Sequence, residues 1–290
     1  PPPPPHRTDA DGQPTQDFEQ ACRALLHEVL AEAGLLRPDS SSSRLALLDL
    51  GIGCGDQSLE LARLARQSGC DDYRYVGLTL NPSQFQMALR QPFHEFRAPG
   101  HADAASSTIR VFRADAARPD AWDADIKSAV ASLTAGRPRD QARWVLALDS
   151  IYHFFPSRRP VLRYAARELD ASFAAFDLLL SDAASPRQRL LIGLVGLAMG
   201  CPVGAFVTEA GYKTQLVEAG YDGRQVVFRD VTDHVYSGLV AHIQRQAAAL
   251  RPLGISVAKF KVAAKLFGWF ARSKTLRATI VVARKKPKTV

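Results

Sequence analysis

The sequence predicts an α/β protein in which helices cover both faces of a doubly wound, largely parallel sheet. From residue 44 onward, short runs of Leu, Val and Ile alternate with stretches of helical periodicity, which is the pattern of such a sheet. Of the 290 residues, 47% are hydrophobic and 23% are charged, which is an ordinary globular composition. No period of about 20 to 50 residues repeats, so solenoids and propellers are excluded.

Two segments precede the sheet. Residues 1–16 are rich in Pro, Asp, Gly, Thr and Gln, and we expect a disordered tail because such a segment buries too little apolar surface to offset its ordering entropy. Residues 17–43 are expected to form one amphipathic helix and a linker, since apolar residues recur at helical spacing from Phe18 to Leu30 and Gly34 follows. The chain begins with Pro1 and no Met, so we expect its start to be trimmed.

Apolar runs define the strands of the expected core at 44–182. The strands are expected at 45–50, 73–78, 109–112, 144–148 and 176–181, and the helices between them at 57–68, 83–90 and 160–169. A β-branched pair at 225–228 and 277–282 is expected to close the sheet, within a closing unit at 223–290. Ligands of open α/β sheets bind beyond the carboxyl ends of the strands, so that edge is where functional residues are expected.

An apolar segment at 190–207 lies between the core and the closing strands. Its 18 residues carry no formal charge, which meets the bare length of a membrane span, but its glycines and Pro202 argue against one. We therefore expect residues 183–222 to form an apolar cap or lid, with a late helix near 214–220. The apolar segment could equally bury its own hydrophobic surface or form a dimer interface.

A glycine turn follows the first strand, at Gly51, Gly53 and Gly55. Glycines let the backbone turn sharply and let a ligand approach it closely. Asp56 stands where the dinucleotide fingerprint needs its last glycine, and no acidic residue follows about 20 residues on, so NAD and FAD are not favoured. No Gly-Lys-Ser/Thr follows, which excludes a P-loop.

With Asp49 before it and an alternating βα chain behind it, this turn resembles the first motif of the class I S-adenosylmethionine-dependent methyltransferases. The resemblance covers about residues 45–182 and implies a Rossmann-like fold of seven strands with an antiparallel last strand. It implies S-adenosylmethionine as cofactor, with the backbone of Gly51, Gly53 and Gly55 against its methionine and ribose portions. Asp49 would hold the glycine loop or the cofactor's amino group.

Two further segments match this family. Residues 76–84 are similar to a segment of the cyclopropane-synthase, tocopherol and sterol methyltransferase branch, which implies that Thr79 and Gln84 satisfy the ribose hydroxyls. After the third strand, the resemblance assigns Asp115 to the adenine amino group, with Ala116 beside it.

The segment after the fourth strand resembles that of small-molecule methyltransferases in natural-product pathways, which places Asp149, Tyr152 and His153 near the sulfonium and the acceptor. Tyr152 replaces the Glu of cyclopropane synthases and tocopherol-type enzymes, so cyclopropanation is not expected. His153 is the best general base by residue type, although a structural or cofactor-shell role is also open. Tyr152 could orient the acceptor or offer its ring face to the sulfonium.

Basic residues are concentrated at the end of the chain. The net charge is +8, but ten of the 37 basic residues and none of the 29 acidic residues lie at 259–290, which leaves 27 basic against 29 acidic residues elsewhere. Residues 257–274 combine Phe260, Ala264 and Phe267 at helical spacing with five basic residues. This helix could make peripheral contact with an anionic membrane, or be an ordinary surface helix packed on one face.

The sequence therefore predicts a methyltransferase that acts on a small, largely apolar molecule. The alternatives are a membrane-associated methyltransferase of a lipid, quinone or sterol, and a non-catalytic binding protein with the same fold. Nucleic acid is not an expected partner, because residues 149–152 lack the Asn/Asp-Pro-Pro-aromatic segment of enzymes that methylate flipped bases. Four scattered cysteines indicate neither a metal site nor disulfides. We expect a cytoplasmic location, with a peripheral position at a membrane as the alternative. The acceptor atom and the oligomeric state stay open.

Overall fold

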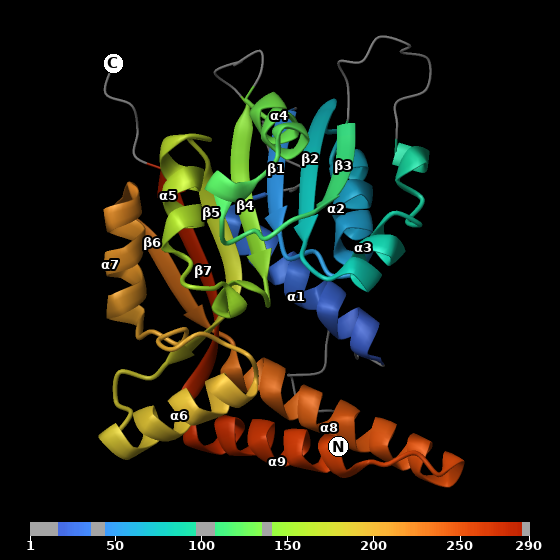
Figure 1. Ribbon diagram of the computed structural model, residues 1–290, viewed down its shortest axis with the longest axis vertical. Coiled ribbons are helices and arrows are strands. Elements are labelled where there is room, and N and C mark those ends of the chain that lie inside the picture. Colours follow the sequence, from blue (N-terminus) through green and yellow to red (C-terminus); the bar gives the residue numbers. More distant parts are fainter. Residues whose placement is uncertain (1–16, 36–43, 97–107, 135–140, 286–290) are drawn as a thin grey trace.

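A computed structural model describes residues 17–35, 44–96, 108–134 and 141–285 of the chain. Within these ranges, seven strands form one sheet in the order β3-β2-β1-β4-β5-β7-β6 (Figure 1). Strands β1 to β5 are parallel, and β7 runs antiparallel to both β5 and β6. The predicted fold class is confirmed. The strands are β1 (Arg44–Leu50), β2 (Asp72–Thr79), β3 (Thr108–Arg113), β4 (Ala142–Leu148), β5 (Ser172–Leu180), β6 (Tyr221–Asp230) and β7 (Leu276–Lys285).

Strand β1 occupies the centre of the parallel part, where Leu48 lies level with Val76 of β2 and Val145 of β4. The predicted strands agree with the observed ones except at β5 and β6, which begin at Ser172 and Tyr221 rather than at residues 176 and 225. The first half of β5 includes Ala174 and Ala175, which lack the β-branched side chains that mark a strand, yet all nine residues of β5 are buried.

Helices cover both faces of the sheet. Leu47 packs with residues of α1 and α2 on one face, whereas Leu48 packs with residues of α4, α5 and α7 on the other. The helix α4 was not predicted; it is short and begins after Asp123, whose side chain accepts from the Ile126 N–H. The covering helices are α1 (Phe18–Ala33), α2 (Asp56–Gln67), α3 (Pro82–Ala88), α4 (Ala124–Ser132), α5 (Arg159–Arg167) and α7 (Glu209–Ala219), and the 3₁₀ turns are η2 (Phe93–Phe96), η3 (Pro119–Ala121), η4 (Ile151–His153) and η5 (Arg251–Leu253).

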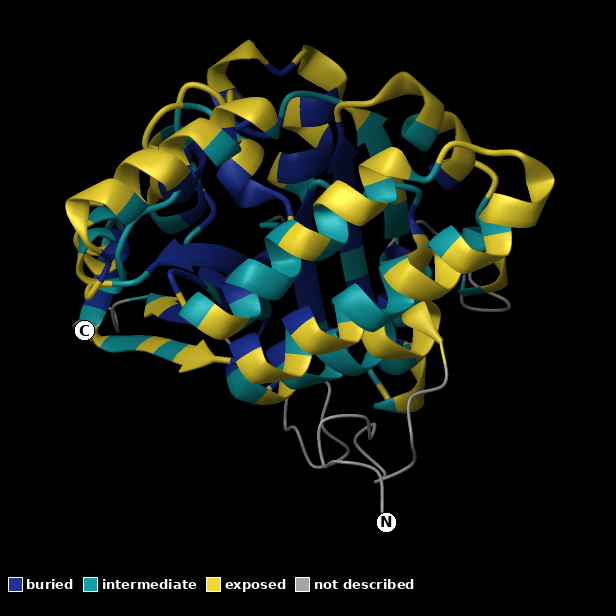
Figure 2. Ribbon diagram, turned by 90° about the horizontal axis from the view of Figure 1, so that it is seen from below, coloured by how far each residue is buried: buried dark blue, intermediate teal, exposed yellow. Residues whose placement is uncertain are grey.

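Three more helices, which we call the cap, lie beyond the carboxyl ends of the parallel strands (Figure 1). They are α6 (Pro186–Ala198), α8 (Thr232–Leu250) and α9 (Ala258–Ser273), and the last two form a hairpin between β6 and β7. Seen from below, the cap helices cross in front of the sheet with largely exposed outer residues (Figure 2). The cap thus faces the edge where a ligand is expected.

The apolar segment at 190–207 is divided in the structure, because α6 ends at Ala198 and Gly200 follows with a φ of 75°. Among the helices of the described ranges, none combines the length and the hydropathy needed to cross a bilayer. The expected tail at 1–16, the serines at 41–43 and the basic residues Lys286 and Lys288 lie outside the described residues.

Candidate functional site

The glycine turn joins β1 to α2 at the carboxyl edge. The N–H groups of Gly51 and Ile52 both donate to the carbonyl of Leu78, at 2.8 and 3.0 Å, which ties the turn to β2. Gly51 has a φ of 81°, and a Cβ there would lie 2.4 Å from the Cβ of Ser150. Only glycine permits this close approach of the turn to the segment after β4.

Gly53 and Gly55 serve different purposes in the same turn. Gly55 has a φ of 84° and precedes α2 without a side-chain cap, and a Cβ there would lie 3.3 Å from Ala88. Gly53 has a φ of 57°, but a Cβ there would meet nothing within 4 Å. The backbone at Gly53 therefore borders open space, as the wall of a ligand site would.

Asp49 lies under the glycine turn and is 3% exposed. The Tyr75 hydroxyl donates to it at 2.7 Å and lies 2.6 Å from the Ser58 hydroxyl, so Asp49 links β1 to β2 and α2. Burial raises the pKa of Asp49 to about 7, against the lowering effect of the Tyr75 hydrogen bond. Tyr75 and Ser58 were not predicted as site residues, since an isolated hydroxyl in an apolar pattern carries no functional signal.

Thr79 and Gln84 meet at the end of β2. The buried hydroxyl of Thr79 donates to the Gln84 side-chain carbonyl at 3.3 Å. Asn81 caps α3 by accepting from the N–H groups of Ser83 and Gln84, which fixes where the Gln84 side chain begins. The structure thus brings together the two polar residues predicted for this strand end.

Asp115 and Ala116 follow β3. One carboxylate oxygen of Asp115 accepts from the Ala117 N–H at 3.0 Å, and its backbone carbonyl accepts from the Trp122 indole N–H at 2.9 Å. Ala116 is buried. Because β3, β2, β1 and β4 are neighbours in that order, the predicted residues after these strands all lie along one edge of the sheet.

Asp149 follows β4 with a φ of 55°, an unusual backbone conformation for a residue other than glycine. Its carboxylate accepts from the Tyr152 hydroxyl at 2.7 Å. Asp149 is exposed although Leu148 and Ser150 on either side are buried. Surrounding protein atoms still desolvate the carboxylate and raise its pKa to about 6.

Tyr152 and His153 lie on the turn η4, beside the segment that follows α6. The ring centroid of buried Tyr152 is 4.4 Å from that of His153 and 5.9 Å from that of Phe206. His153 is exposed, and its Nδ1 is 3.5 Å from the Cys201 sulfur. Partial burial lowers the pKa of His153 and so favours the neutral imidazole. Cys201 was not predicted as a site residue, because no motif surrounds it in the sequence.

A buried ion pair anchors the segment after α6 to the core. Arg158 and Asp177 form the pair, and they are 4% and 0% exposed. Arg158 also donates to the carbonyl of Ala205, and its guanidinium lies 4.6 Å from the centre of the Tyr212 ring. Phe206, which follows Ala205, is thereby held against Tyr152.

The described residues contain no group of three or more His, Cys, Asp or Glu side chains placed to hold a metal ion. All four cysteines are free.

No model of a known protein family matches the chain, and no curated protein matches it. Solved structures do match. A protein from Galdieria sulphuraria, provisionally assigned as a sarcosine dimethylglycine methyltransferase, is 18% identical with a TM-score of 0.60, over 90% of this chain and 84% of that one. Phosphoethanolamine N-methyltransferase 2 of Haemonchus contortus, in complex with S-adenosyl-L-methionine, is 12% identical with a TM-score of 0.61, over 91% of this chain and 52% of that one.

The chain thus spans about half the length of the Haemonchus protein. A third match, the [4+2]-cyclase SpnF, is 16% identical with a TM-score of 0.58, over 93% of this chain and 83% of that one. At such low sequence identities, the structural similarity shows a common Rossmann-like fold, as predicted from the glycine turn. They do not show a common reaction, since one of these neighbours is named for a cyclisation.

Proposed function

We propose that the chain is an S-adenosylmethionine-dependent methyltransferase acting on a small, largely apolar molecule. The observation that carries this proposal is the close approach of the glycine turn, at Gly51, to Ser150, which follows the exposed Asp149. A glycine turn that borders open space at Gly53, near an exposed carboxylate, suits a cationic cofactor.

The predicted site residues along the carboxyl edge follow the order of the cofactor's methionine, ribose and adenine portions. The backbone of Gly51, Gly53 and Gly55 would hold the methionine and ribose portions, Thr79 and Gln84 the ribose hydroxyls, and Asp115 and Ala116 the adenine. When bound, S-adenosylmethionine supplies a methyl group on a positively charged sulfur. Most of what the chain must add is position and orientation.

Two carboxylates with raised pKa values support the binding of a cation. Burial disfavours the ionised forms of Asp49 and Asp149, and a nearby positive charge would offset that cost. Asp149 would face the sulfonium, and the Tyr152 hydroxyl would hold the carboxylate in place. Asp49, at the end of β1 before the glycine turn, would hold the turn or the cofactor's amino group.

The acceptor would lie beside His153. Its neutral imidazole can accept the proton that a phenol, alcohol or ammonium acceptor must lose. Phe206, Tyr152 and Cys201 supply a mostly apolar wall, which supports an apolar acceptor and the exclusion of water. A small apolar molecule, such as an intermediate of a natural-product pathway, would pack against these side chains.

Two other functions remain as competing proposals. The acceptor could be a lipid, quinone or sterol within a membrane, which the basic α9 would serve. The fold could also act without transferring a methyl group, a possibility that the cyclase among the structural neighbours supports.

Incubation of the chain with methyl-labelled S-adenosylmethionine and a panel of amine, phenol, thiol and carbon acceptors tests the proposal. We expect label in at least one acceptor, and loss of transfer in His153→Ala if that acceptor must be deprotonated. Full activity of His153→Ala from pH 6 to pH 9 would exclude His153 as the base. Cofactor binding without transfer to any acceptor, detergent-dispersed lipids included, would overturn the methyltransferase in favour of a non-transferring role.

A further inference from the structure

The outer face of α6 is apolar. Leu190, Leu191, Leu194 and Leu197 are 68%, 46%, 57% and 54% exposed, and their spacing places them on one side of the helix. The opposite side packs inward through Ile192 and Gly196. A surface helix normally presents polar residues to water, so a leucine face of this kind marks a contact surface.

The cap also carries positive charge with almost no negative charge. None of the 29 acidic residues lies at 183–208 or at 234–290. Asp233, the acidic residue at the start of α8, lies 2.8 Å from Lys274. Eight cations on the cap helices or in the adjoining turn η5 are exposed and make no ion pair with any residue that the structure describes: Arg187, Arg189, Arg245, Arg251, Lys259, Lys261, Lys265 and Arg272.

Residues of α8 cover apolar side chains in the second half of α9, although Val262 in the first half is 67% exposed. Tyr236 of α8 packs against Phe267 and Phe270 of α9, with ring centroids 5.9 and 5.6 Å apart. Helix α9 is therefore not an isolated amphipathic helix whose whole apolar side is free to lie on a surface. The contact surface of the cap instead has two components, the leucines of α6 and the cations of α8 and α9.

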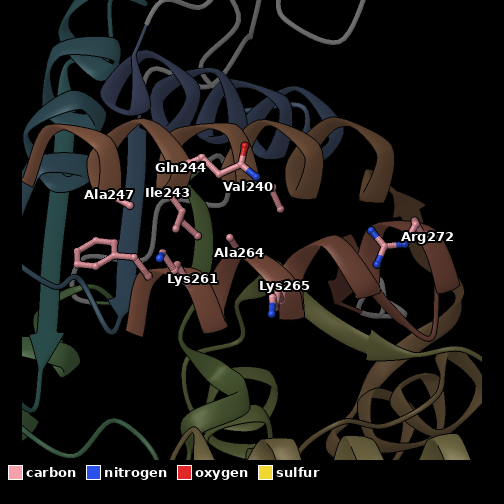
Figure 3. A pocket seen from close by; sticks show the side chains of 9 residues that line it. Val240, Ile243, Gln244, Ala247, Lys261, Ala264, Lys265 and Arg272 are labelled. Atoms are coloured by element: carbon pink, nitrogen blue, oxygen red, sulfur yellow. The ribbon is translucent and has the colours of Figure 1, made fainter. Parts of the chain in front are cut away.

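A groove of about 390 Å³ separates part of α8 from α9 (Figure 3). Val240 and Ile243 from α8 and Phe260 from α9 line it, and its charged lining residues, which include Lys261 and Lys265, are all cations. Apolar lining beside positive charge suits an amphiphile with an anionic head group.

We propose that the cap docks on an anionic bilayer, with the α6 leucines in the interface and the α8 and α9 cations against lipid head groups. Charge complementarity favours a membrane over a second copy of this chain, because two caps facing each other would oppose like charges. Cys201 and Phe206 follow α6 directly and contact the site. Under the proposed function, docking would bring the acceptor side of the site to the membrane, from which an apolar acceptor can enter.

Co-sedimentation of the full chain with vesicles tests this proposal. We expect association with vesicles of equal parts phosphatidylcholine and phosphatidylglycerol, but not with phosphatidylcholine alone, and loss of association at high salt. Lys261→Glu with Lys265→Glu should weaken binding at least about tenfold. Lys127→Glu with Lys213→Glu changes the net charge equally, away from the cap, and should leave binding nearly unchanged.

A second pair of variants tests the leucines. Leu190→Ser with Leu194→Ser should weaken vesicle binding, whereas Val217→Ser, an exposed apolar residue on α7, should not. Calorimetry with S-adenosylmethionine, which does not depend on the cap surface, separates this proposal from the proposed function. Failure of the wild type to bind anionic vesicles would overturn the docking proposal, as would equal losses in the control variants. Self-association that the leucine variants abolish would make this face a dimer interface instead.

Discussion

The Tyr152 hydroxyl donates a 2.7 Å hydrogen bond to the carboxylate of Asp149, three residues earlier at the end of β4. The bond fixes one carboxylate oxygen and opposes the effect of burial on the pKa of Asp149. Tyr152 stands where the enzymes that this segment resembles have Glu, and it supports a carboxylate that is already present at Asp149.

Tyr152→Phe removes this hydrogen bond and should raise the pKa of Asp149 above its value of about 6. If methyl transfer requires the ionised carboxylate, kcat/KM decreases at pH values below this pKa. The acidic limb of the pH profile should then move to higher pH in the variant. Tyr221→Phe is the control, because the buried Tyr221 hydroxyl has no hydrogen-bond partner in the described structure. An acidic limb that stays in place would show that the bond does not set the ionisation of Asp149.

The affinity ratio of S-adenosylmethionine to S-adenosylhomocysteine isolates the sulfonium charge, because the two ligands differ in the methyl group and that charge. We expect the ratio to decrease as pH falls through about 6, where Asp149 becomes protonated. Asp149→Asn should give a low ratio that no longer depends on pH in this range. Calorimetry at several pH values measures both constants, and a pH-independent ratio in the wild type would place the sulfonium away from Asp149.

Asp49→Asn should stabilise the ligand-free protein at alkaline pH. Asp49 retains its proton up to about pH 7 in the folded state, against an ordinary value of 3.8, so the wild type loses stability as pH rises from about 4 to 7. The variant escapes this loss, which amounts to at most about 4 kcal/mol at pH 8. Urea unfolding at pH 4.5 and pH 8 should show a gain at pH 8 and little at pH 4.5. A gain of the same size at both pH values would contradict the ionisation argument.

Arg158→Met should destabilise the fold by about 3–5 kcal/mol, because it leaves the fully buried carboxylate of Asp177 without its cation. Adding Asp177→Asn should recover part of this loss. The neighbouring Arg159 pairs with Glu218 at the surface, so Arg159→Met should cost less than about 1 kcal/mol. Equal losses for the two methionine variants, measured by denaturant unfolding, would argue against a buried anchor.

Local signals made the sheet and the glycine turn predictable. Gly51, Gly53 and Gly55 are close in sequence and need backbone conformations that favour glycine, so their pattern is visible without a structure. The strands β1 and β4 contain apolar runs, at 45–48 and 144–148, and such runs can be recognised in the sequence. The beginning of β5 was missed because Ala174 and Ala175 pack in the core without the bulk that marks a strand.

Contacts between distant segments could not be predicted in this way. Cys201 lies 48 residues from His153 in sequence and meets it through the segment after α6. The pairing of Arg158 with Asp177 likewise depends on how α5 docks on β5. The apolar stripe of α9 indicated a partner but not which one, and the structure supplies α8.

Calorimetric titration with S-adenosylmethionine of the wild type, Gly53→Ala and Gly69→Ala tests the central claim most directly. Both glycines have positive φ, 57° and 69°, and a Cβ at either would meet no protein atom within 4 Å, so the two substitutions strain the backbone alike. If the cofactor lies against the glycine turn, the wild type and Gly69→Ala bind it and Gly53→Ala does not. Absence of binding to the wild type at high micromolar cofactor, or equal binding to both variants, would contradict the claim.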